Sequence, residues 1–235
     1  MEGVGPHGGR HLAAPRKPRV ELTLLAPPSI DTLTTEAALD LAAKAAPSVD
    51  VLELGTPLIK SAGLSVITAM KEAHPDKTVF ADLKTMDAGE LEADIAFAAG
   101  ADLVTVLGVA GDSTIAGAVA AAEKHGKGVV VDLIGVADKP ARAREVVALG
   151  AQFVEVHAGL DEQAEEGFTF STLLEAGEAS GVPFSIAGGV NASSIAAVQA
   201  SGAIIAVAGS AIYSADDVAA AAAELRAAVT EAAAV

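Results

Sequence analysis

The chain contains no cysteine, very few aromatic residues and few basic ones. Without cysteine, disulfides, thiolate catalysis and cysteine-ligated zinc are excluded. Aromatic residues make up only 3% of the 235 residues although hydrophobic residues make up 51%, so the core must be built from alanine, valine, leucine and isoleucine. The formal net charge of −16 argues against a nucleic-acid or anionic-membrane partner, because both bind lysine and arginine.

Long apolar runs are also missing. None approaches the roughly 18 residues of a membrane span, and the N-terminus lacks the apolar centre of a signal peptide. We therefore expect a cytoplasmic protein. Residues 1–19 are rich in glycine, proline and basic side chains, which is typical of a flexible N-terminal extension. One domain is expected over 20–235.

From Val20 onward, apolar runs alternate with alanine-rich stretches that predict helices, such as 36–46, 115–125 and 217–229. This alternation predicts parallel strands in an α/β fold. The length of the chain suits a single (β/α)₈ TIM barrel. An open doubly wound sheet is the alternative, although no G-x-G-x-x-G opens a helix after the first strand. After a strand within 20–30, strands are predicted at 49–54, 78–83, 102–107, 128–134, 152–157, 183–187 and 203–208.

The segment 80–87 carries the densest group of ionisable side chains, Asp82, Lys84 and Asp87. On a strand, Asp82 and Lys84 share one face, and Asp87 follows in a loop or at a helix start. Such a cluster is costly to desolvate for structure alone, and it can hold a divalent metal and move protons. A surface ion pair is the simpler alternative.

Other polar residues also fall at predicted strand ends, where a barrel forms its active site. Glu53 and Asp82 are candidate ligands for Mg²⁺, which prefers oxygen atoms, unless Glu53 only accepts a hydrogen bond from Lys84. His157 suits proton transfer, unless it is a structural histidine. Loops after the last two strands suit a phosphate group held by backbone N–H groups, or are merely turns. Asp132 and the glycine-loop residues Gly188, Gly189, Gly209 and Ser210 complete this rim.

Several segments resemble the 3-hexulose-6-phosphate synthases, in the orotidine monophosphate decarboxylase superfamily. The D-x-K-x-x-D spacing of 82–87 marks the superfamily, and Glu53-Leu54-Gly55-Thr56-Pro57-Leu58-Ile59 is similar to the branch that also holds 3-keto-L-gulonate-6-phosphate decarboxylase. Similar segments are Val104-Thr105-Val106-Leu107-Gly108, Val156-His157-Ala158-Gly159 and Ala187-Gly188-Gly189.

The resemblance implies a homodimeric, Mg²⁺-dependent barrel, in which Mn²⁺ substitutes, that condenses formaldehyde with D-ribulose 5-phosphate through an enediolate. It implies that Glu53 and Asp82 hold the metal, and that Lys84 stabilises the enediolate charge. It also implies that Asp87 reaches into the partner's site and that His157 moves a proton at the reacting carbon. Phosphate binding by Gly189, Gly209 and Ser210 is implied in the same way.

Two positions depart from the family pattern. Asp31 matches a substrate-contacting Asp at the end of the first strand, but Pro27 and Pro28 precede it and lack the N–H donors of a strand. Ser210 stands where the decarboxylase branch can place Arg, which favours the synthase. Two alternatives to the synthase stay open: the decarboxylase, on the same enediolate chemistry, and a catalytically silent barrel used as an assembly scaffold.

Overall fold

The computed structural model of the chain describes residues 19–24 and 33–232, with side chains from 33 to 229. The predicted extension up to residue 18, the Pro27-Pro28 pair and Asp31 lie outside the described residues. Arg19, which we expected in the extension, is instead the first residue of a strand. That strand ends at Leu24, before the two prolines.

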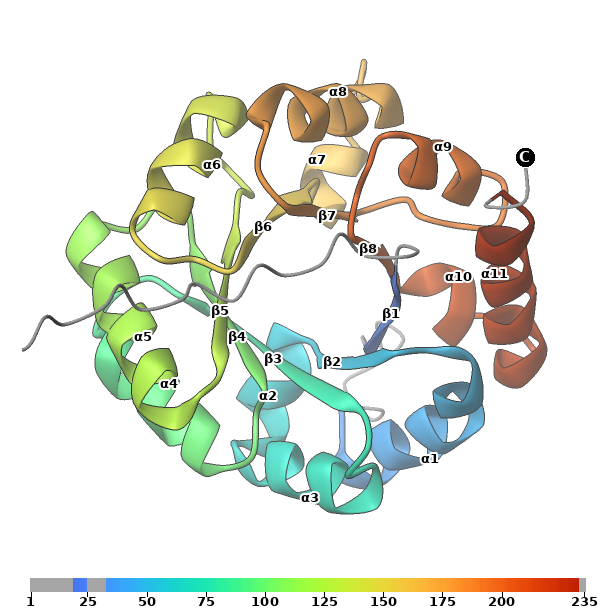
Figure 1. The fold of residues 1–235 in the computed structure, drawn as a ribbon. Coiled ribbons are helices and arrows are strands. Elements are labelled where there is room, and N and C mark those ends of the chain that lie inside the picture. Colours follow the sequence, from blue (N-terminus) through green and yellow to red (C-terminus); the bar gives the residue numbers. More distant parts are fainter. Residues whose placement is uncertain (1–18, 25–32, 233–235) are drawn as a thin grey trace, which may run out of the picture.

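The strands form an inner ring, and every neighbouring pair is parallel (Figure 1). They close into a barrel in chain order, because β1 pairs with both β2 and β8. The predicted α/β class with parallel strands is therefore confirmed, and the open doubly wound sheet was wrong. The strands are β1 (Arg19–Leu24), β2 (Val51–Leu54), β3 (Thr78–Thr85), β4 (Leu103–Leu107), β5 (Gly128–Asp132), β6 (Phe153–His157), β7 (Phe184–Ala187) and β8 (Ile205–Ala208).

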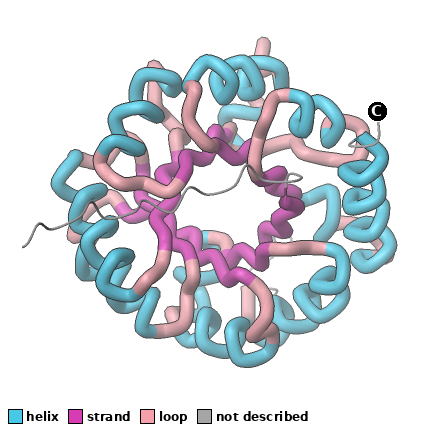
Figure 2. The backbone as a smooth tube through the Cα atoms, viewed as in Figure 1, coloured by secondary structure: helices cyan, strands magenta, loops and turns pink. Residues whose placement is uncertain are grey.

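Helices form an outer ring around the strands (Figure 2). Local signals set several of their ends: the Thr34 side chain caps the first helix, and Gly126 in a left-handed conformation ends α5 (Asp112–His125). Among the described helices, none has the length and apolar character needed to cross a membrane. They are α1 (Thr35–Ala45), η2 (Ala46–Ser48), α2 (Thr56–Ala62), α3 (Ser65–Ala73), α4 (Gly89–Ala98), α5 (Asp112–His125), α6 (Lys139–Ala148), α7 (Leu160–Gln163), α8 (Phe170–Ser180), α9 (Ile195–Ala200), α10 (Ser210–Tyr213) and α11 (Val218–Ala232).

Alternation along the strands divides the buried apolar residues into two clusters. Leu52 and Leu54 of β2 belong to the larger cluster, which also contains the buried faces of the helices. Val51 belongs to a second cluster, to which the strands contribute residues from the opposite face and which therefore fills the barrel interior. Its members are Val51, Phe80, Leu103, Val130, Phe153, Ala187, Ile205 and Val207.

Candidate active site

Buried polar side chains point into the barrel beyond this interior cluster, toward the carboxyl ends of the strands. Side chains two residues apart share a face, so Asp82 follows Phe80 inward on β3, and Glu155 follows Phe153 on β6. Each is at most 5% exposed. We call the set the inward polar layer: Glu53, Asp82, Thr105, Asp132 and Glu155.

Lys84 lies against this layer and pairs with two of its carboxylates. Its Nζ is 2.5 Å from Asp132 Oδ2 and 3.1 Å from Asp82 Oδ2. Burial alone would lower the pKa of Lys84, but the charges of Asp82, Asp132 and Glu155 outweigh burial and raise the pKa. The ammonium therefore stays charged, which fits a group that stabilises negative charge and disfavours a Schiff base.

His157 donates to the same aspartate. Its Nδ1 is 3.0 Å from Asp132 Oδ2, and because an ionised carboxylate only accepts, Nδ1 carries the proton and Nε2 is the exchanging nitrogen. Burial would lower the pKa of His157, but the hydrogen bond and charge of Asp132 raise it above its ordinary value. Burial would raise the pKa of Asp132, yet His157 and Lys84 lower it to about 2.

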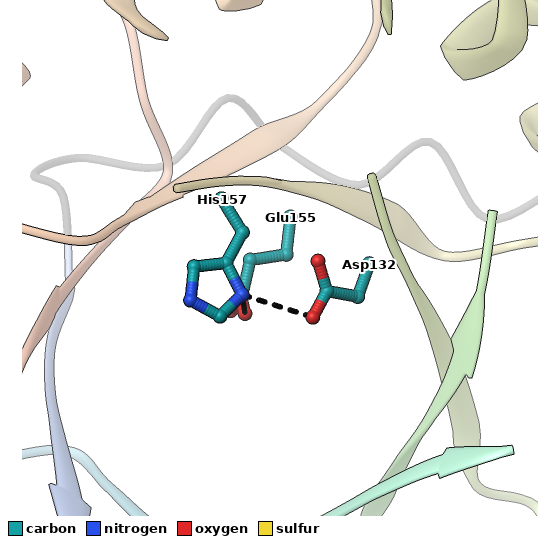
Figure 3. Close-up of side chains that lie close together, drawn as sticks. All are labelled: Asp132, Glu155 and His157. Carbon is teal, nitrogen blue, oxygen red and sulfur yellow. Dashed lines mark hydrogen bonds and ion pairs between the residues drawn. The ribbon is translucent and has the colours of Figure 1, made fainter. Parts of the chain in front are cut away.

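Glu155 completes this group from the strand of His157. In Figure 3, Asp132, Glu155 and His157 point toward one another inside the barrel, and Glu155 Oε1 is 3.6 Å from His157 Nδ1. The Glu155 side chain also accepts from Ser185 Oγ at 3.4 Å. Burial, followed by the negative charges of Glu53 and Asp132, raises the pKa of Glu155 well above its ordinary value.

Asp82 and Lys84 sit in a bulge of β3. Ala81 pairs with Val104 and Thr85 with Val106, so residues 82–84 oppose the single residue Thr105. Lys84 has φ +47°, a left-handed conformation that costs a non-glycine residue of the order of 1–3 kcal/mol. The expectation that Asp82 and Lys84 face the same way is met through this bulge, whereas simple strand alternation stops at Leu83.

Two groups of side chains offer ligands for a cation. The predicted pair, Glu53 and Asp82, comes from the neighbouring strands β2 and β3 and offers only oxygen atoms, which suits Mg²⁺. A second group, Asp132, Glu155 and His157, has ligand atoms within 4.8 Å of one another. Its imidazole nitrogen is less suited to Mg²⁺ than to transition metals. In this group, Asp132 Oδ2 already accepts from His157 and Lys84.

The glycine loops lie at the same end of the barrel. Gly188-Gly189 follows β7, and Gly209-Ser210 follows the neighbouring strand β8. Gly188 has φ +98°, and a Cβ there would lie 2.5 Å from the backbone oxygen of Ala158, so a side chain is excluded on two counts. These loops thus present backbone at the rim, as a phosphate site requires.

Asp87 is separated from this group. It lies in the loop before α4, is exposed, and bonds only locally to the N–H of Ala88 among its described hydrogen bonds. The loop and the helix after it also expose apolar side chains: Met86 is 54% exposed, Leu91 64% and Ile95 45%. Asp87 therefore belongs to an outer surface of the barrel.

Comparison with known proteins assigns the chain to a protein family. Residues 28–225 match the family model described as "Orotidine 5'-phosphate decarboxylase / HUMPS family". The chain belongs to this family. That match confirms the resemblance inferred from the 82–87 segment.

Relatives within the family are close over nearly their whole length. The 3-hexulose-6-phosphate synthase of Mycobacterium gastri is 71% identical over 86% of this chain and 97% of its own. A crystal structure titled 3-hexulose-6-phosphate synthase is 67% identical and superposes with a TM-score of 0.85, covering 89% of this chain and 99% of that one. The 3-keto-L-gulonate-6-phosphate decarboxylase of Vibrio cholerae is 28% identical with a TM-score of 0.78, covering 92% and 98%.

Four side chains in or beside the inward polar layer were not predicted from the sequence. Glu155 and Thr105 each lie two residues after an interior residue, Phe153 and Leu103, and so share its face, which strand alternation could have shown. Thr56 lies at the start of α2, and its hydroxyl donates to Asp82 Oδ2 at 2.9 Å. No sequence pattern predicted this contact. Ser185 lies within the apolar run 183–187, which predicted a strand but no polar site residue.

Proposed function

We propose that the chain is a 3-hexulose-6-phosphate synthase, an aldehyde-lyase that joins formaldehyde to D-ribulose 5-phosphate. The observation that carries this proposal is the high identity to a named synthase along nearly all of that protein's length. The inward polar layer supports it, because a charged lysine and a hydrogen-bonded histidine meet at buried carboxylates, as proton removal next to a ketone requires. A cytoplasmic location goes with the proposal.

The reaction breaks a C–H bond at the terminal carbon beside the ketone and forms a C–C bond to formaldehyde. His157 Nε2 takes the proton, and the resulting enediolate carries negative charge that the Lys84 ammonium stabilises. Its carbon attacks formaldehyde, whose oxygen takes up a proton and becomes a hydroxyl group. Asp132 holds both His157 and Lys84 in place throughout, since each contacts its Oδ2.

We further propose that Glu53 and Asp82 hold Mg²⁺, with Mn²⁺ able to substitute. Their buried, oxygen-only donor set supports this assignment. When bound, the ion would polarise the substrate's ketone oxygen and acidify the adjacent C–H. The phosphate would rest on the backbone of Gly188, Gly189, Gly209 and Ser210, and Asp31 would contact the substrate.

Removal of single ligands tests this metal site. Glu53→Gln or Asp82→Asn should weaken Mn²⁺ binding, measured calorimetrically, by at least about tenfold, because each removes a charged oxygen ligand. Glu155→Gln serves as the matched control from the alternative group and should stay within about threefold of the wild type. Equal or greater weakening by Glu155→Gln would move the metal to Asp132, Glu155 and His157.

We also propose a homodimer with shared active sites. The exposed Met86 is next to Asp87, and the exposed Leu91 and Ile95 belong to the helix that follows. Exposed apolar side chains of this kind are suited to burial against a second copy. Within such a dimer, Asp87 would reach the partner's site.

A two-substrate assay tests the function. With Mg²⁺ present, the chain should consume formaldehyde only when ribulose 5-phosphate is added. Carbon dioxide release from 3-keto-L-gulonate 6-phosphate should be slower by at least about 100-fold in kcat/KM, in line with differential transition-state binding. Faster decarboxylation would assign the chain to the decarboxylase, and no turnover of either substrate would favour the non-catalytic scaffold.

A further inference from the structure

Thr105 is the single residue of β4 opposite the bulge of β3. The strand pairing passes from Ala81–Val104 to Thr85–Val106, so the backbone of residues 82–84 loses its regular ladder at Thr105. Asp82 and Lys84 both lie in this segment. Their positions therefore depend on whatever replaces the missing strand hydrogen bonds.

The Thr105 hydroxyl makes two hydrogen bonds to this segment, one of them to its backbone. The backbone N–H of Lys84 donates to Thr105 Oγ1 at 2.8 Å, and Oγ1 donates to Asp82 Oδ1 at 2.8 Å. The directions are fixed by chemistry, because an N–H only donates and a carboxylate only accepts. Thr105 is fully buried, so water does not compete for either bond.

We propose that Thr105 is a positioning residue for the reaction: its hydroxyl fixes the bulge so that the Lys84 ammonium and the Asp82 carboxylate face the substrate together. Lys84 holds a left-handed backbone conformation at φ +47°, and its N–H is the group that Thr105 binds. Loss of the hydroxyl would let the backbone relax and swing the Lys84 side chain away from Asp132. The inference rests on the proposed function, in which Lys84 stabilises the enediolate.

Thr56 offers an instructive contrast. Its hydroxyl donates to the other oxygen of Asp82, Oδ2, at 2.9 Å, but it contacts the carboxylate and not the bulge backbone. Thr56→Val should therefore cost less turnover than Thr105→Val. Ser180 serves as a control for the general effect of removing a buried hydroxyl. It is 2% exposed, donates to the carbonyl of Gly177 and accepts from the N–H of Val182.

The experiment compares Thr105→Val, Thr105→Ser and Ser180→Ala. Thr105→Val should lower kcat by about 10–100-fold while the KM for ribulose 5-phosphate changes by less than about threefold, as expected for a misplaced catalytic group. Thr105→Ser keeps the hydroxyl and should retain kcat within about threefold. Ser180→Ala should lower the melting temperature and leave kcat within about twofold. If Thr105→Val does not fold, Thr105→Ala takes its place.

Crystal structures of the variants provide a readout that does not depend on turnover. In Thr105→Val, the separation of Lys84 Nζ and Asp132 Oδ2 should exceed about 3.5 Å, compared with 2.5 Å here, and Thr105→Ser should restore it. An unchanged kcat in Thr105→Val, or equal loss in Thr105→Ser, overturns the inference. If the wild type itself lacks formaldehyde condensation, the proposed function fails, and the crystal structures alone decide the role of Thr105.

Discussion

At the scale of single residues, Lys84 and Asp82 form an ion pair, and each is proposed to act through its charge. Asp82→Asn and Lys84→Ala should each lower kcat by about 100-fold or more, as expected for groups that stabilise developing charge. Both side chains point into the mouth of the barrel and leave the apolar clusters intact, so circular dichroism should show folded proteins. Turnover near the wild-type level in either folded variant would remove the inward polar layer from the mechanism.

His157 should set the acidic limb of the pH profile. Its pKa is raised, so the imidazole stays protonated to a higher pH than an ordinary histidine and accepts a proton only above that pKa. The limb of kcat/KM should therefore lie above 6.5, the ordinary value.

Asp132→Asn checks the cause of that shift. It removes the charge that raises the pKa of His157 and leaves the effect of burial, which lowers it. The acidic limb of kcat/KM should then move to lower pH, whatever happens to the maximal rate. A limb that stays in place or moves upward would contradict the assignment of His157 as the base.

The candidate site could be predicted in part from the sequence. Asp82, Lys84, Asp132 and His157 were expected at one rim, and the structure brings them into contact. Their contacts were not predictable, because the left-handed conformation of Lys84 and the bulge opposite Thr105 arise from pairing between strands distant in sequence. Asp87 was placed correctly in a loop, while its proposed action on a partner stays a prediction.

At the scale of elements, the amino ends of the strands are expected to serve stability. Asp102, just before β4, accepts from Lys71 Nζ at 2.8 Å, Lys127 Nζ at 2.6 Å and the backbone N–H of Val79 at 2.9 Å. Asp102→Ala should cost about 1–3 kcal/mol of unfolding free energy, because it leaves these donors without their acceptor.

Chemical denaturation measures that cost, and kcat should remain within about twofold of wild type because the site lies at the opposite end. Asp40→Ala is the matched control, since Asp40 pairs only with exposed Lys44 on the surface of α1 among its described ion pairs. Such a pair should contribute about 0.3–0.5 kcal/mol. A cost for Asp102→Ala no larger than that of Asp40→Ala would show that the three bonds of Asp102 contribute little.

The observed ends of strands and helices agree closely with the predicted ones where the hydrophobic periodicity of the sequence was strong. The predicted strand 102–107 is β4, Leu103–Leu107, and the predicted helix 36–46 is α1, Thr35–Ala45. β3 extends to Thr85, two residues beyond its predicted end, because pairing with Val106 resumes after the bulge. β5 ends at Asp132, earlier than predicted, because the Asp132 side chain accepts from the N–H of Ile134 and turns the chain.

At the scale of the whole molecule, Asp87 should act on the partner's site. A mixture of Asp87→Ala and His157→Ala chains forms heterodimers in which one site carries both defects and the other carries neither. Activity per heterodimer should reach about half that of the wild-type dimer, by the symmetry of an isologous pair. Each homodimer should be weak alone. If subunits exchange, shown by mass spectrometry, and no activity returns, Asp87 serves its own subunit.

The proposed activity requires this barrel to form a carbon–carbon bond between formaldehyde and a pentulose phosphate. Carbon-13 NMR of labelled formaldehyde with ribulose 5-phosphate, enzyme and Mg²⁺ follows that bond directly. The label should appear in the new primary alcohol carbon of a hexulose phosphate. A chelator should stop its appearance, and added Mg²⁺ should restore it. Label that remains as formaldehyde hydrate with the folded, Mg²⁺-supplied protein would contradict the claim.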